Sequence, residues 1–307
     1  MPHIGPLTVS AVGLGCNNFG WHIDEAASQA VVDAALDAGI THFDTAELYG
    51  DGASERFLGR ALGCRREEVV IATKCGYRPK GGPGGQATPV AVRAACEGSL
   101  RRLGTDRIDL YYLHRPDTDT PIADTLGALA GLVTEGKVRA IACSGFSADQ
   151  LREAEAAASG ARFVAVQNEY SLLHREPEGG VLDACREQGL AFVPYFPLKS
   201  GLLTGKYRRG DTDADGRLNA TEGKFKTMGD EVLTEANLDT VERLMAWAEG
   251  HGHTILDLAF AYLLAHAPVA SVIAGATKPS QIRANVDAAA WVLTADDLAE
   301  VDAVVAG

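Results

Sequence analysis

The sequence predicts a (β/α)8 TIM barrel, an α/β fold formed as a single domain over residues 1–307 with long loops at the C-terminal mouth. Eight short apolar or β-branched runs recur along the chain, and most begin about 25 to 40 residues after the previous one. Stretches with helical period lie between the runs, as parallel β-α units require. An open doubly wound sheet is the competing topology, because the number of strands does not exclude it. The eight runs are VSAVGLG (9–15), THFDTA (41–46), VVIATK (69–74), DLYYLH (109–114), VRAIACS (138–144), FVAVQN (163–168), AFVPYF (191–196) and VASVIAG (269–275).

Four of the intervening segments are typical of helices. Residues 26–39 place alanine and valine at helical spacing and close at Gly39, where a C-terminal glycine cap belongs. Residues 54–63 begin at Ser54, which predicts an N-cap there. The other two helical segments are LGALAGLVTEG (126–136) and ILDLAFAYLLAHA (255–267).

Two polar, glycine-rich segments predict loops over one end of the barrel. RPKGGPGGQATP (78–89) follows the third run. Residues 205–231, GKYRRGDTDADGRLNATEGKFKTMGDE, lie in the long interval before the last run. Long loops of this composition are common at binding mouths, so we expect the longer one to lie beside the substrate pocket.

The composition predicts a cytoplasmic globular protein, monomeric or a small homo-oligomer. The chain is 46% hydrophobic and 22% charged, with a formal net charge of -13. Acidic groups repel nucleic acid and anionic membranes, so we expect neither as a partner. The most apolar segment, residues 260–276, is broken by His266 and Pro268, and the N-terminus lacks the pattern of a signal peptide. Six scattered cysteines without a C-x-x-C pair predict reduced thiols and no metal site.

Two glycine motifs resemble nucleotide-binding loops of other folds, and both are incomplete. GLGCNN (13–18) follows a strand but lacks the third glycine of G-x-G-x-x-G. GLVTEGKV (131–138) ends in Val138, which has no hydroxyl for magnesium, and it precedes a strand instead of following one. Neither a Rossmann site nor a P-loop is therefore predicted.

Polar side chains stand at the ends of three consecutive predicted strands. The second strand ends at Asp44 with Tyr49 just beyond, the third at Lys74 and the fourth at His114. Each has an ordinary explanation alone, as a helix cap, a solvated strand end or a core histidine. Because the C-terminal ends of barrel strands converge on one mouth, the four together predict a catalytic site.

These residue types suit the reduction of a carbonyl group. Hydride arrival at carbon develops negative charge on oxygen, which needs a proton donor. Tyr49 is the candidate donor, because a neighbouring Lys74 ammonium lowers the pKa of a phenol from about 10. Asp44 would keep Lys74 charged and oriented, and a neutral His114 would position the substrate oxygen. A barrel lyase that uses Lys74 as a Schiff base is an alternative.

The sequence resembles the aldo-keto reductase family, most closely its bacterial members. The similarity spans nearly the whole chain, and it implies a (β/α)8 barrel that uses NADPH, without metal, to reduce a small-molecule aldehyde or ketone. A non-catalytic, redox-sensing protein that binds NADPH is the rival reading within the family. The motifs that carry the resemblance are VGLGCNNFG, FDTAELYG, VVIATK, LYYLHRPD, VQNEYSLL, PLKSGLLTGKY and IAGATKPSQIRAN.

The resemblance implies where the nicotinamide and pyrophosphate bind. Ser144 and Gln167 match the positions that hydrogen-bond the nicotinamide amide, and Tyr195 matches the aromatic residue that stacks on its ring. The family's usual asparagine after the serine is replaced here by Gly145, which loses one side-chain contact. The segment LKSGLLTG implies pyrophosphate contacts from Leu198, Ser200 and Gly201, and Lys199 either joins them or points to water.

The resemblance also implies how the adenosine end of NADPH is held. GATKPSQIRAN opens a helix, whose N-terminus favours anions. Lys278 matches the partner of the 2′-phosphate, and NADPH is therefore expected over NADH. Some family members carry arginine at the position of Gln281, and a nearby Arg283 is expected to face solvent. The residues implied at this end are Gly275, Thr277, Lys278, Gln281 and Asn285.

The substrate pocket is the least specified part of the predicted site. Trp21, His22 and Phe19 follow the first strand and are candidates to line it, together with Tyr49 and His114. Aromatic residues there predict an apolar or ring-bearing carbonyl compound, whereas Trp21 can equally pack at the rim. The sequence does not choose among aldehyde, ketone and sugar.

Overall fold

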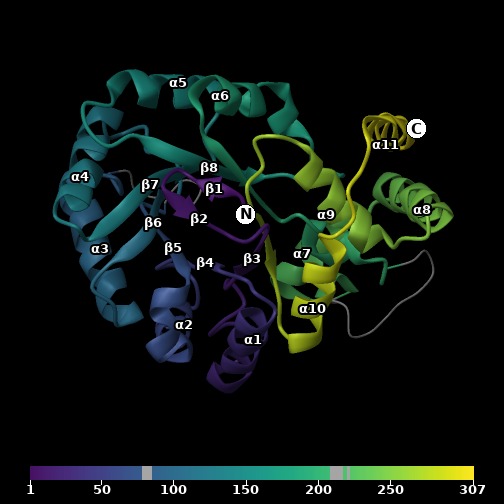
Figure 1. Ribbon diagram of the computed structural model, residues 1–307, viewed down its shortest axis with the longest axis horizontal. Coiled ribbons are helices and arrows are strands. Elements are labelled where there is room, and N and C mark those ends of the chain that lie inside the picture. Colours follow the sequence, from purple (N-terminus) through teal and green to yellow (C-terminus); the bar gives the residue numbers. More distant parts are fainter. Residues whose placement is uncertain (78–84, 208–216, 220–221) are drawn as a thin grey trace.

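Eight parallel strands form the centre of the molecule in a computed structural model of the chain (Figure 1). The structure describes residues 1–77, 85–207, 217–219 and 222–307. Hydrogen-bonded neighbours follow the order β10-β3-β4-β5-β6-β7-β8-β9. The strands are β3 (Val12–Gly15), β4 (His42–Asp44), β5 (Val70–Cys75), β6 (Ile108–Leu113), β7 (Val138–Ser144), β8 (Phe163–Glu169), β9 (Ala191–Tyr195) and β10 (Val272–Gly275).

The sheet closes on itself between β9 and β10. The amide of Phe192 donates to the carbonyl of Pro268 at 3.0 Å, and its carbonyl accepts from the amide of Ala270 at 3.0 Å. These bonds lie just before β10 and complete the ring. The barrel is therefore confirmed over the open doubly wound sheet.

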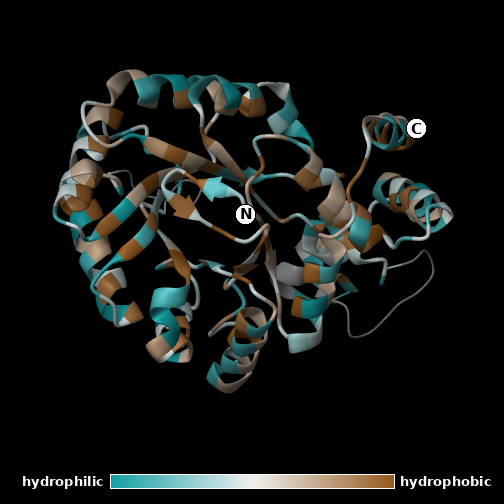
Figure 2. Ribbon diagram, in the orientation of Figure 1, coloured by the Kyte–Doolittle hydropathy of each residue, from teal (hydrophilic) through white to brown (hydrophobic). Residues whose placement is uncertain are grey.

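Helices surround the barrel and bury their apolar sides against it (Figure 2). Helices α8 (Glu235–Gly250) and α11 (Ala295–Ala306) pack on each other at the outer edge (Figure 1). Short 3-10 turns are η1 (Gly63–Glu68), η2 (Glu176–Gly179), η3 (Lys199–Thr204) and η4 (Arg217–Asn219). The other helices are α1 (Glu25–Asp37), α2 (Ala53–Leu62), α3 (Pro89–Leu103), α4 (Ile122–Thr134), α5 (Ala148–Ala157), α6 (Val181–Gln188), α7 (Gly223–Val232), α9 (Ile255–Ala265) and α10 (Pro279–Ala288).

A short hairpin that the sequence does not predict closes the N-terminal end of the barrel. It consists of β1 (His3–Ile4) and β2 (Leu7–Thr8). Ile4 and Leu7 are buried in the same apolar cluster as side chains of the barrel interior, including Val70 and Leu110. The turn at Gly5 has a φ of +53°, and a Cβ there would lie 2.7 Å from that of Val164. With this end sealed, the C-terminal strand ends form the open mouth.

Two local expectations are wrong. Helix α2 begins at Ala53, with Gly52 as its N-cap, so Ser54 is not the cap. The buried Ser54 hydroxyl instead donates to the carbonyl of Cys16 at 2.8 Å, which ties α2 to the end of β3. The insertion at 205–231 is not only a loop, because α7 begins within it at Gly223. Residues 208–216 and 220–221 lie outside the described residues, as do residues 78–84 of the other loop.

The expected glycine cap at Gly39 is confirmed. Helix α1 ends at Asp37, and Gly39 follows with a φ of +79° while its amide donates to the carbonyl of Leu36. Glycine adopts this left-handed conformation at little cost, which is why it terminates helices.

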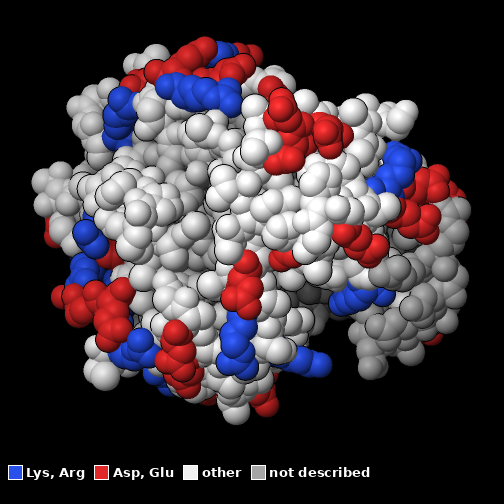
Figure 3. Space-filling model, turned by 45° about the vertical axis from the view of Figure 1, so that its right-hand side comes forward, with Lys and Arg blue, Asp and Glu red and all other residues white. Residues whose placement is uncertain are grey.

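The described part of the surface carries charges of both signs. No helix among the described residues combines the length and the apolarity that crossing a membrane demands. On the face drawn in Figure 3, basic side chains lie beside acidic ones, and the described residues form no broad basic area there. Exposed ion pairs such as Glu67 with Arg107 are of this kind.

Candidate active site at the barrel mouth

Asp44, Lys74 and Tyr49 meet at the C-terminal ends of β4 and β5, as the sequence predicts. The Lys74 ammonium lies 2.5 Å from Asp44 Oδ1 and donates to the carbonyl of Thr45 at 2.8 Å. The same group lies 3.4 Å from the Tyr49 hydroxyl. Lys74 is fully buried and Asp44 is 3% exposed, so the charged pair is shielded from water. Shielding of this kind strengthens the electrostatic interactions between these groups.

The loop after β4 is folded tightly enough to return Tyr49 to the strand end. The amide of Tyr49 donates to the carbonyl of Ala46 at 3.0 Å. Gly50, Asp51 and Gly52 then follow with positive φ. A Cβ on Gly50 would lie 2.8 Å from the carbonyl oxygen of Phe19, so the glycine permits a close approach that other residues would block.

Burial and charge act in opposite directions on the two proton-carrying groups. Burial lowers the pKa of Lys74, but the Asp44 carboxylate and Tyr49 outweigh it and raise that pKa above its usual value. Burial raises the pKa of Tyr49, Lys74 lowers it and Asp44 raises it, so the pKa of Tyr49 lies above its ordinary value. Tyr49 is thus protonated at neutral pH and can act as an acid.

His114 follows β6 and is held as a neutral imidazole. Its ring centroid lies 6.1 Å from that of Tyr49, edge to face, and 5.2 Å from that of Tyr77. Burial, together with the positive charges of Lys74 and Arg115, lowers the pKa of His114 to about 2. Its buried Nδ1 has no hydrogen-bond partner among the described residues. A neutral ring with a free nitrogen suits a contact to a substrate oxygen.

The two residues expected at the nicotinamide amide lie side by side on β7 and β8. Ser144 pairs with Gln167 in the strand register, and both are buried. The Gln167 amide nitrogen, however, donates to Asp44 Oδ2 at 2.9 Å, a link that the sequence does not predict. Its oxygen remains the atom that a carboxamide N–H would use.

The backbone conformation at position 145 explains why a glycine occupies it. Its φ is +71°, and its amide donates to Asn168 Oδ1 at 2.8 Å. Glycine and asparagine are the residues that adopt this region most readily. The Arg115 guanidinium stands 2.7 Å from the position a Cβ on Gly145 would take, and it makes no hydrogen bond or ion pair with a described residue. Arg115 was not predicted, although it directly follows His114.

The segment after β9 is shaped for close contact. Tyr195 ends β9, and its ring lies 5.3 Å from that of Phe196. Because Tyr195 is only half-buried, it is not part of the buried core. Phe196, Lys199, Ser200 and Gly201 all have positive φ, whereas Leu198 does not. Lys199 is half-buried, and its ammonium pairs with Glu169 at 2.7 Å. Strained backbone of this kind is concentrated at ligand sites.

The start of α10 carries the residues expected at the adenosine end. Lys278 is exposed at the N-cap position, whereas Asn285 is buried on the inner side. The Gln281 side chain folds back so that its oxygen accepts from the amides of Thr277 at 2.7 Å and Lys278 at 3.2 Å. Gly275 leaves little space, since a Cβ there would lie 3.1 Å from the side-chain amide of Asn18.

These features together fit a dinucleotide. The positive-φ segment follows β9 and the α10 N-terminus follows β10, and Gln281 already places an oxygen on two amides at the start of α10. An oxygen acceptor at that position shows that the helix start binds such atoms. Among the described residues, no group of three His, Cys, Asp or Glu side chains is arranged to hold a metal ion.

The substrate side is only partly as expected. Phe19 does not line the pocket, because it is fully buried in the core. Trp21 is 51% exposed and stacks on His22, with ring centroids 4.1 Å apart, which fits a place at the rim. Tyr77, next to His114, was missed, although it lies two residues after the end of β5 and the strand-end argument would have found it.

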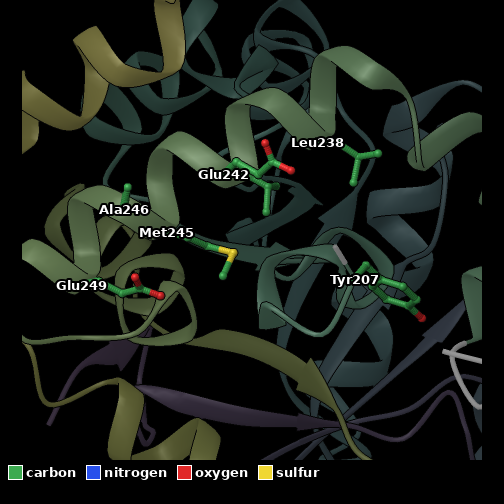
Figure 4. A pocket seen from close by; sticks show the side chains of 7 residues that line it. Tyr207, Leu238, Glu242, Met245, Ala246 and Glu249 are labelled. Carbon is green, nitrogen blue, oxygen red and sulfur yellow. The ribbon is translucent and has the colours of Figure 1, made fainter. Parts of the chain in front are cut away.

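A hollow on the outer surface is unrelated to these residues. It has a volume of about 390 Å³ and lies along α8, between Tyr207 and Glu249 (Figure 4). The strand-end residues do not line it.

Comparison with known proteins identifies the family of this chain. The model of the Aldo/keto reductase family matches residues 11–306. The chain belongs to the aldo/keto reductase family. Enzymes of this family are oxidoreductases that act on carbonyl groups with a nicotinamide cofactor.

Individual relatives cover almost the whole chain. Probable aldo-keto reductase 1 of Glycine max is 38% identical over 300 residues, covering 95% of this chain and 84% of the relative. L-glyceraldehyde 3-phosphate reductase of Escherichia coli O157:H7 is 34% identical over 309 residues, covering 96% of this chain and 89% of the relative. The solved structure of the glycerol dehydrogenase AKR11B4 from Gluconobacter oxydans superposes with a TM-score of 0.81 at 31% identity, covering 97% of this chain and 92% of that one.

Proposed function

We propose that this aldo/keto reductase reduces an aldehyde or ketone to an alcohol with NADPH, and that Tyr49 donates the proton. The observation that carries the proposal is the buried triplet in which one ammonium, Lys74, lies within 3.4 Å of both a carboxylate and a phenol. NADPH, when bound, supplies the hydride. The chain supplies the proton, the binding contacts and the exclusion of water.

Tyr49 would protonate the substrate oxygen as negative charge develops there. Loss of its proton leaves a phenolate, which the Lys74 ammonium at 3.4 Å stabilises. Asp44 keeps that ammonium charged and oriented in a site where burial alone would favour the neutral amine. The Tyr49 proton is afterwards replaced from solvent.

His114 would orient the carbonyl. Because its pKa is lowered to about 2, it remains neutral and offers a hydrogen bond without competing as an acid. The Tyr77 ring, 5.2 Å away, would form an apolar wall beside it.

Preference for NADPH over NADH is supported by the α10 start. Lys278 is an exposed cation at a helix N-terminus, where a 2′-phosphate gains from both the ammonium and the backbone amides. Gln281 occupies the amides of Thr277 and Lys278. A phosphate must displace this oxygen, so the preference should be smaller than with a second cation at position 281.

A substrate that carries an anionic group is supported by Arg115. The guanidinium is close enough to lower the pKa of His114, and it has no partner among the described residues. A phosphate or carboxylate would pair with it in a fork geometry. The similarity to L-glyceraldehyde 3-phosphate reductase of Escherichia coli points to the same class of compound.

The direct test is NADPH consumption with three aldehydes: an aromatic aldehyde, glyceraldehyde and glyceraldehyde 3-phosphate. We expect turnover with each, and a lower KM for the phosphate ester than for glyceraldehyde. In Arg115→Met that advantage should disappear while turnover of the aromatic aldehyde is kept. If cofactor fluorescence shifts on binding but no aldehyde is reduced, the chain is a redox-sensing NADPH-binding protein instead.

A further inference from the structure

Gln167 joins opposite sides of the barrel. It lies on β8, which is separated from β4 by β5, β6 and β7, yet its side-chain amide reaches Asp44 Oδ2 at 2.9 Å. Both groups are buried, with 3% exposure each. A hydrogen bond to a charged acceptor in a shielded interior is stronger than an exposed one.

The two oxygens of Asp44 are thereby divided between two partners. Oδ1 accepts from Lys74 at 2.5 Å, and Oδ2 accepts from Gln167. A carboxylate held at only one oxygen rotates about its own bond, whereas one held at both is fixed. The direction from which Asp44 faces Lys74 is therefore set from β8.

Ser144 lies beside Gln167 at the same level of the barrel but is not linked to Asp44. It is the register partner of Gln167 and shares its expected role at the nicotinamide amide. No hydrogen bond joins its hydroxyl to Asp44, although both residues are described. Of the two positions, only Gln167 is connected to the charged pair.

We propose that Gln167 is a positioning residue for the proton donor, because it holds Asp44 so that Lys74 stays directed at Tyr49. The inference rests on the proposed function, in which Tyr49 gives the proton. It adds that one side chain serves both the cofactor side, through its oxygen, and the proton-donating side, through its nitrogen.

The groups around Tyr49 define what the loss of Gln167 would do. Lys74 and Asp44 face it from β5 and β4, Cys16 from the end of β3, and neutral His114 from the end of β6. Without the Gln167 N–H, the negative charge of Asp44 is less compensated. Tyr49 should then ionise at a higher pH.

The experiment compares Gln167→Met, which removes the donor at similar length, with Ser144→Ala as the matched control. Ionisation of Tyr49 is read as tyrosinate absorbance in a rapid pH jump without cofactor, after subtracting the same protein carrying Tyr49→Phe. We expect Gln167→Met to raise the ionisation pH of Tyr49 by about half to one pH unit. Ser144→Ala should leave it unchanged.

Cofactor titrations complete the comparison. Both variants should weaken NADPH binding, measured by fluorescence, since both touch the expected amide site. Gln167→Glu provides a second variant of nearly identical shape, and its added charge should raise the ionisation pH of Tyr49 further. An unshifted Tyr49 in both Gln167 variants, or an equal shift in Ser144→Ala, overturns the proposal. Because the absorbance needs no turnover, failure of the proposed reaction would be seen separately, as wild-type protein that reduces no aldehyde.

Discussion

The Lys74 ammonium lies 3.4 Å from the Tyr49 hydroxyl, and its own charge is maintained by Asp44 at 2.5 Å. A phenol alone is a weak acid at neutral pH, with a pKa near 10. Burial makes the pKa of Tyr49 higher still, and Lys74 opposes that effect. The proposed role of Tyr49 as proton donor therefore depends on Lys74 more than on the tyrosine's own acidity.

Replacing the lysine should remove most of the activity. We expect Lys74→Met to lower kcat by at least about a hundredfold, the usual scale of acid catalysis. Asp44 would then be a buried carboxylate without its cation, so the variant should also unfold more easily. The double variant Asp44→Asn with Lys74→Met should recover stability but not kcat. A double variant as active as wild type would show that the pair is only structural.

The cofactor preference should depend on Lys278. We expect Lys278→Met to raise the Kd for NADPH about ten- to a hundredfold, the worth of one charged hydrogen bond, with little change for NADH. Arg283→Met, an exposed cation on the same helix, is the control and should affect neither cofactor. Fluorescence titration with both cofactors measures this. Equal losses for NADPH and NADH in Lys278→Met would place the 2′-phosphate elsewhere.

The sequence revealed the barrel and the four strand-end residues for a clear physical reason. Strands buried on both faces read as continuous apolar runs, and the C-terminal ends of such strands must meet at one mouth. A polar residue at an apolar strand end, such as Lys74 in IATKC, is therefore visible without a structure. The same argument would have found Tyr77.

Other features depend on contacts that no local pattern contains. The hairpin at Ile4 and Leu7 has strands of two residues, too short for any periodicity. Gln167 reaches across the barrel to Asp44, and the Gln281 oxygen returns to the start of its own helix. The directions of these two side chains are set by packing in the folded molecule, and sequence spacing does not predict them.

Stability should fall in mild acid because of His42 inside the barrel. Burial lowers its pKa to about 4, whereas the unfolded chain takes up a proton near 6.5. The unfolded state thus binds the proton first, so stability is constant above about pH 6.5 and declines as the pH falls toward 4. Between pH 7 and 5 the loss should be about 2 kcal/mol for this group. Urea unfolding at pH 7 and at pH 5 measures this loss of unfolding free energy. The loss should be smaller in His42→Leu than in wild type. In the exposed control His3→Leu it should equal that of wild type.

Gly145 should tolerate asparagine better than alanine. Its φ of +71° costs a residue with a Cβ about 1 to 2 kcal/mol, and asparagine is the side chain that bears this conformation best. In thermal unfolding, Gly145→Asn should therefore have a higher Tm than Gly145→Ala. Gly127→Ala, in the middle of α4 with open space around it, is the control and should stabilise by up to about 1 kcal/mol. A stabilising Gly145→Ala would mean that the loop adopts another conformation in solution.

The most direct test of the central claim is Tyr49→Phe, which removes one oxygen and leaves Lys74, Asp44 and His114 in place. With an aromatic aldehyde and NADPH, we expect kcat to fall by about a hundredfold or more while the Kd for NADPH stays close to that of wild type. Turnover at the wild-type rate with intact cofactor binding would show that another group delivers the proton, and the role of Tyr49 would be wrong.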